Sequence, residues 1–108
     1  MTNREKLEVL KNFLTENKII FKEDFPLKNA PGVRADLYVR RYDRIAVHLS
    51  DEHDQEFYNS VKRMYEPFFV RDNETAEFII EKMQNTIIRS MQHKQLLYEN
   101  MKKRELNK

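Results

Sequence analysis

Two segments of the chain alternate apolar and polar residues with a period of two, and three residues separate them. The apolar positions of residues 33–40 are Val33, Ala35, Leu37 and Val39, and those of residues 44–50 are Ile45, Val47 and Leu49. This alternation is typical of half-buried strands, and the short connection predicts an antiparallel hairpin. The two apolar faces match only across a loop with an odd number of residues. Three residues at 41–43 would place Leu37 opposite Val47 and Asp36 opposite His48.

Three helices are predicted around this hairpin, because apolar side chains recur there at spacings of three and four residues. The first is expected to start at a Thr2 capping box and to end at Asn17 in a left-handed conformation. The second is expected to take Ser50 or Asp51 as its cap, with carboxylates in its first turn. The third is expected to start at Asn73 and to carry an apolar stripe.

Two further strands complete the predicted sheet. Residues 19–25 alternate and should form a strand that ends before Pro26, and residues 68–70 should form a short buried strand after Pro67 closes the second helix. The order helix, three strands, helix, strand, helix predicts an α/β (α+β) domain with a sheet packed between helices. We place this domain at residues 1–91. A basic helical extension is expected at residues 92–108, where apolar residues thin out among charges.

Composition narrows the class of protein. A chain of 108 residues with 40% hydrophobic residues is typical of one folded domain. The absence of cysteine excludes disulfides and thiolate metal sites, and a single glycine argues against a phosphate-cradling glycine loop. The chain has no uninterrupted apolar segment of the kind that forms a signal peptide or a membrane span. We therefore expect a cytoplasmic protein without membrane contact.

Three stretches carry a family resemblance. They are RADLYV at 34–39, RIAVHLSDEH at 44–53, and DQEFYNSVKRMYEPFFVRDNETAEFIIEKMQNTI at 54–87. In order and pattern, residues 4–88 resemble the PD-(D/E)XK nuclease superfamily, and within it the small very-short-patch-repair-type endonucleases. The resemblance implies a restriction-endonuclease-like fold, in which a mixed sheet is flanked by helices.

The resemblance also implies a site. Such nucleases hold Mg²⁺ with an Asp and a Glu on neighbouring strands, and the ion activates the attacking water. Asp36 matches that Asp, with Glu8 as the acid of the first helix and His53 in support. His48 stands where the family has Glu, and Ser50 where it has Lys or Asp. The expected metal ligands are Asp36, His48 and His53. The resemblance implies Mg²⁺ at this site, whereas an imidazole ligand suits Mn²⁺ better, so either ion is expected.

The same residues have structural explanations. Asp36 would then be a strand carboxylate paired with a neighbouring arginine, and His48 its partner across the hairpin. His53 would be a solvated residue of the first helical turn. A zinc site made from His48, Asp51 and His53 is a further alternative, although the spacing matches no strong motif.

Two functions follow from these alternatives. One is a nuclease-like domain that has lost turnover and binds DNA or a protein partner, and the other is an active small metal-dependent endonuclease. The missing Glu and Lys favour the first. The basic residues expected to contact DNA are Arg34, Arg40, Arg41, Lys102, Lys103 and Arg104. The apolar residues of the extension also suit a protein partner or self-association.

Overall fold

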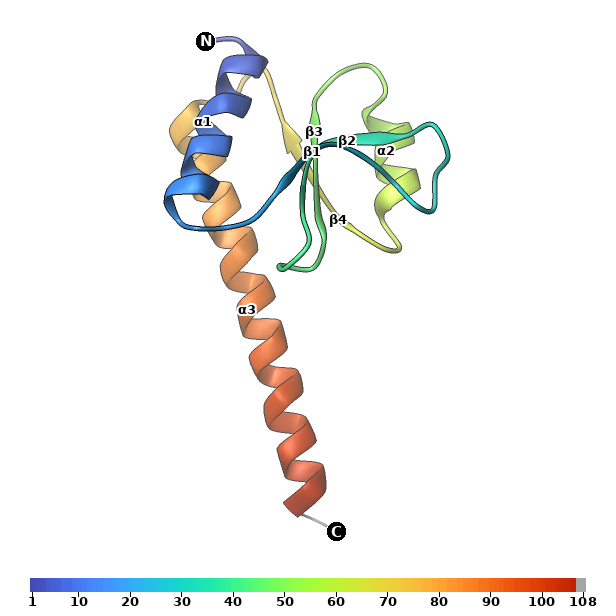
Figure 1. Ribbon diagram of the computed structural model, residues 1–108, viewed down its shortest axis with the longest axis vertical. Helices are drawn as coiled ribbons and strands as arrows, with labels where there is room; N and C mark the ends of the chain where they lie inside the picture. Colours follow the sequence, from blue (N-terminus) through green and yellow to red (C-terminus); the bar gives the residue numbers. More distant parts are fainter. Residues whose placement is uncertain (107–108) are drawn as a thin grey trace.

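The computed structural model describes the backbone of residues 1–106 and the side chains of residues 1–103. Over these residues the chain forms three helices and four strands (Figure 1). In chain order they are α1 (Asn3–Glu16), β1 (Lys22–Pro26), β2 (Arg34–Val39), β3 (Ile45–Leu49), α2 (Asp54–Val61), β4 (Glu66–Val70) and α3 (Ala76–Leu106). The predicted α+β class and order of elements are confirmed.

The strands form one open sheet in the order β1-β2-β3-β4. The first three strands are antiparallel neighbours, whereas β4 runs parallel to β3. Parallel neighbours require a crossover connection, and α2 supplies it. Each edge strand holds a proline, Pro26 in β1 and Pro67 in β4.

The predicted hairpin register is confirmed, because Leu37 lies opposite Val47. The connection is longer than the three residues expected. Strand β2 ends at Val39 and β3 begins at Ile45, so residues 40–44 lie between them. Asp43 and Arg44 both have φ of 56°, a left-handed conformation that cannot continue a strand.

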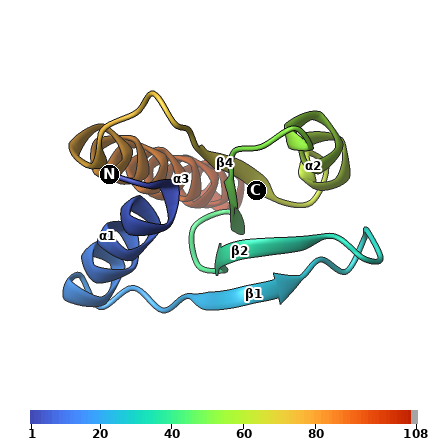
Figure 2. The same cartoon turned by 90° about the horizontal axis from the view of Figure 1, so that it is seen from above.

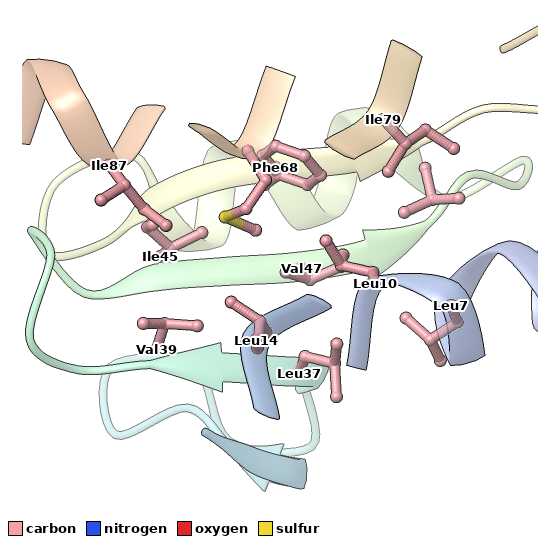
Figure 3. Close-up of a cluster of buried hydrophobic side chains, with 12 residues drawn as sticks. Leu7, Leu10, Leu14, Leu37, Val39, Ile45, Val47, Phe68, Ile79 and Ile87 are labelled. Carbon is pink, nitrogen blue, oxygen red and sulfur yellow. The ribbon is translucent and has the colours of Figure 1, made fainter. Parts of the chain in front are cut away.

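Helices cover both faces of the sheet, as Figure 2 shows from above. One face packs on α1 and α3, and the other on α2. The larger core lies between the sheet and the two helices α1 and α3 (Figure 3). Its buried residues are Leu7, Leu10, Leu14, Leu37, Val39, Ile45, Val47, Phe68, Val70, Ile79, Met83 and Ile87.

The smaller core, under α2, includes Ala35, Tyr38, Ala46 and Phe57. Ala35 was expected on the same face as Leu37, and that expectation is wrong. The alternation breaks at Asp36, the residue between them, whose carboxylate bonds to the backbone of β3. The break in the alternation thus lies at the residue whose side chain bonds to the neighbouring strand.

The helix ends differ from expectation at four places. Thr2 caps α1 as predicted, but Lys18 (φ 58°), and not Asn17 (φ −92°), takes the left-handed conformation. Helix α2 starts at Asp54, so neither Ser50 nor Asp51 is its cap.

Helix α3 starts at Ala76, and the Thr75 hydroxyl accepts a hydrogen bond from the Phe78 amide. Thr75 therefore caps this helix and Asn73 does not. Pro67 lies inside β4, whereas the sequence predicted it as the end of the second helix.

Burial on α3 ends at Ser90, and from Met91 onward the described residues of the helix are exposed. The second half of α3 projects beyond the sheet (Figure 1), and the molecule measures 55 × 31 × 22 Å. The Lys94 ammonium still donates to the Arg41 carbonyl in the β2–β3 connection. The predicted boundary between a domain at residues 1–91 and an extension at residues 92–108 stays a prediction, although burial of α3 ends at Ser90. Within residues 1–106, none of the helices is both long enough and apolar enough to cross a bilayer.

Candidate functional site

The structure brings Asp36 and His48 together where strands β2 and β3 separate. Regular pairing between these strands ends at Leu37 and Val47. Beyond that point, the Asp36 Oδ2 atom accepts a 2.8 Å hydrogen bond from the Leu49 amide and lies 3.9 Å from His48 Nδ1. We call Asp36, His48 and Leu49 the strand fork. The carboxylate of Asp36 takes the place of a backbone partner for β3.

Packing fixes the orientation of the His48 ring. The ring stacks on Phe57 of α2 with centroids 4.4 Å apart and meets Phe69 of β4 edge-on at 5.9 Å. Its Nδ1 atom faces Asp36, and its Nε2 atom lies 3.2 Å from Asp51 and 3.5 Å from Asp54. The imidazole therefore connects the fork to the acidic turn that follows β3.

This acidic turn, residues 50–54, is held by its own hydrogen bonds. The Asp51 carboxylate accepts from the His53 amide at 2.7 Å, and the Asp54 carboxylate accepts from the Asp51 amide at 2.9 Å. The Ser50 hydroxyl donates to Asp54 at 2.6 Å, and Arg71 lies 3.3 Å from the same carboxylate. Ser50 thus has a structural contact in the turn.

One group of side chains in the described part of the chain could hold a metal ion, namely His48, Asp51 and Asp54. One ligand atom from each lies within 4.8 Å of the others. One imidazole nitrogen and two carboxylates suit Mn²⁺ or Zn²⁺. The second ring nitrogen of His48 faces the Asp36 carboxylate at 3.9 Å, which is beyond hydrogen-bond distance. Asp51 and Asp54 lie three and six residues after His48. This spacing alone does not predict that the three side chains meet, because that depends on the conformation of the turn.

The pKa of the Asp51 carboxyl is lowered from its ordinary value of 3.8, mainly by the hydrogen bond from the His53 amide and partly by the one from His48. A lowered pKa in the folded state stabilises the protein above pH 3.8, and this stabilisation is lost as pH falls below that value. We expect Asp51→Asn, in the presence of a chelator, to melt at a lower temperature than the natural protein at neutral pH. The difference should narrow below pH 3.8, and a difference independent of pH would contradict this assignment.

Glu8 lies in a surface pocket of about 430 Å³ that Asp36 also lines. Its carboxylate pairs with Lys11, which also lies 2.7 Å from Glu23. The hydrogen bonds that the Lys11 ammonium donates to Glu23 and to Glu8 raise the pKa of Lys11, so the ammonium stays charged. Glu8 therefore lines the same pocket as Asp36, but its carboxylate is already paired with the Lys11 ammonium.

His53 is placed away from the strand fork. It precedes α2, and its ring nitrogens lie 3.5 Å from Glu52 and 3.4 Å from Glu56. Of the three expected metal ligands, the structure thus brings together Asp36 and His48 and leaves His53 in solvent contact.

The expected DNA-binding residues are dispersed. Arg34 pairs with Asp24 at 2.6 Å, while Arg40 and Arg41 are exposed in the β2–β3 connection. Lys102 and Lys103 are exposed on the projecting part of α3. The side chain of Arg104 lies outside the described residues.

Comparison of the chain with protein-family models, with curated proteins and with solved structures gives no match. The functional argument therefore rests on the geometry of the site.

Proposed function

We propose that this protein is a nuclease-like domain that binds DNA and has lost Mg²⁺-dependent turnover. One observation carries the proposal. An imidazole, and not a carboxylate, faces Asp36 across the strand fork, with His48 Nδ1 3.9 Å from Asp36 Oδ2. Mg²⁺ takes hard oxygen ligands, and a site with one carboxylate and one imidazole holds it poorly. The resemblance to PD-(D/E)XK nucleases is part of this proposal.

The acids around Asp36 do not replace the missing carboxylate. Glu8 is paired with Lys11, and Asp24 is paired with Arg34. A lysine that activates water in such a site would have to lose its proton near neutral pH. Lys11 lines the same pocket, but its raised pKa keeps it protonated.

An active metal-dependent endonuclease is the second candidate, and the group of His48, Asp51 and Asp54 favours it. Mn²⁺ accepts an imidazole ligand beside carboxylates and can lower the pKa of a bound water. In that case Mn²⁺, and not Mg²⁺, would support cleavage.

Plasmid DNA incubated with the protein and either ion separates the two candidates. We expect supercoiled DNA to remain intact with Mg²⁺ and with Mn²⁺, and to be retarded in a gel with a shift that weakens as salt rises. Retardation is then due to binding at phosphates. A protein that neither cuts nor retards DNA would contradict DNA binding and would point to a protein partner.

Two variants control the cleavage assay. Asp36→Asn keeps an acceptor for the Leu49 amide and removes the charge, whereas Asp36→Ala removes both. Cutting with Mn²⁺ that Asp36→Asn abolishes, while its circular dichroism spectrum is unchanged, would establish the endonuclease and refute the loss of turnover.

A further inference from the structure

A second pocket, outside the strand fork, gathers four basic side chains without an acid. It has a volume of about 680 Å³, within the range of ligand sites, and none of its lining residues is Asp or Glu. Its cations are Lys22, Lys28, Arg40 and Arg44, and all four are exposed. We call it the basic pocket.

These cations differ from the paired cations of the protein. Lys11, Arg34 and Lys82 lie within 3 Å of carboxylates. In the described part of the chain, no carboxylate lies within ion-pair distance of any cation of the basic pocket. Four like charges held around one pocket repel one another, and an anionic ligand would relieve that repulsion.

Aromatic rings form the body of the pocket. Its aromatic lining residues are Phe21, Phe25, Tyr38 and Tyr65. Phe25 stacks on Tyr38 with centroids 4.2 Å apart and planes at 9°, and Tyr65 meets Tyr38 edge-on at 5.7 Å. Half-buried Phe25 and Phe21 contribute apolar surface beside the charges.

We propose that the basic pocket binds an unpaired nucleotide of single-stranded DNA. Cations around the rim suit the backbone phosphates, and aromatic rings offer π faces on which a base stacks without sequence preference. A base inside a duplex is already stacked and cannot enter such a pocket. An acidic peptide would satisfy the charges but would make no use of the half-buried rings of Phe21 and Phe25, so the aromatic lining favours DNA.

The position of the pocket connects it to the strand fork. Tyr38 follows Asp36 by two residues on β2, a separation of about 7 Å along a strand. A strand of DNA held in the pocket would therefore pass close to the fork. The inference rests on the DNA binding proposed above and adds the form of DNA that is recognised.

Fluorescence anisotropy with a short labelled oligothymidylate, and with a duplex of equal length, tests the proposal. We expect the single strand to bind more tightly than the duplex. Replacing Arg40 and Arg44 together by alanine should weaken binding and lower the slope of log K against log salt by about 1.4, for two lost phosphate contacts. The Phe25→Leu variant should weaken single-strand binding about tenfold with an unchanged salt slope.

A matched control removes two cations outside the pocket. Arg4→Ala with Lys62→Ala changes the net charge equally and should alter affinity less than about twofold, because neither residue lines the basic pocket and salt screens exposed charges. Duplex bound as tightly as single strand, with pocket variants unaffected, would overturn this inference and leave the proposed DNA binding intact. No binding of either form would overturn both. In a further outcome, oligoglutamate of equal charge displaces the oligothymidylate while Phe25→Leu leaves the affinity unchanged. That result would assign the pocket to an acidic peptide instead.

Discussion

The Leu37→Ala variant is expected to lower the free energy of unfolding by about 3 kcal/mol. Leu37 is fully buried in the second strand of the sheet, opposite Val47 and beneath α1. Figure 3 shows its side chain directed into the same cluster as Leu10 and Leu14. Truncation removes apolar contacts and leaves a cavity between the sheet and the helix, which cannot collapse without moving both.

Urea unfolding followed by circular dichroism measures this loss. Leu97→Ala is the matched control, because the same atoms are removed from a side chain that is 51% exposed on the projecting part of α3. The control should stay within about 0.5 kcal/mol of the natural protein. A loss below about 1 kcal/mol for Leu37→Ala would show that this packing is not formed in solution.

The Lys82→Met variant is expected to cost about 3 kcal/mol, although the methionine keeps most of the apolar stem. The Lys82 ammonium lies 2.8 Å from the Glu74 carboxylate and donates to the Phe69 carbonyl at 2.7 Å. The Lys82 Nζ atom also lies 4.8 Å from the ring centroid of Phe68. The Glu74 side chain is only 11% exposed. Removing the ammonium leaves that carboxylate largely buried, with the Arg71 amide as its remaining donor.

A double-mutant cycle isolates the pair. Glu74→Gln in the Lys82→Met background should recover part of the stability, since a neutral amide costs less to bury than a carboxylate. The exposed pair of Arg89 and Glu66, 3.9 Å apart, provides the comparison, and its coupling should be below about 0.5 kcal/mol. Equal coupling energies for the two pairs would refute the role assigned to burial.

The order of elements was predictable because it depends on local periodicity. Alternation in residues 33–40 and 44–50, with the need for an odd loop, was enough to place Leu37 opposite Val47. Helix ends were less predictable, since Thr75 and Asn73 are equally good caps in sequence and only the path of the chain after β4 decides between them. The connection gained Arg40 and Arg44, and its left-handed conformations at Asp43 and Arg44 cannot be predicted from either residue type.

The candidate site was predictable only where it depends on strand register. Asp36 and His48 adjoin the last paired residues, Leu37 and Val47, so the register brings them close to each other. The approach of Asp51 and Asp54 to His48 depends instead on a turn whose conformation comes from its own hydrogen bonds. The basic pocket could not be found in the sequence, because its cations come from β1, from the loop after it and from the β2–β3 connection. Their charges are separated along the chain by acidic residues that point elsewhere.

The prolines of the two edge strands bear on how this protein avoids aggregation. An open sheet exposes unpaired backbone groups along both margins, where a second chain could add a strand. Pro26 in β1 and Pro67 in β4 each remove one amide donor from such a margin, and the left-handed Asp24 distorts β1 further. Neither margin offers a continuous ladder. Growth of the sheet from copy to copy is therefore disfavoured at both ends, even though four strands in a small domain leave half of them at an edge.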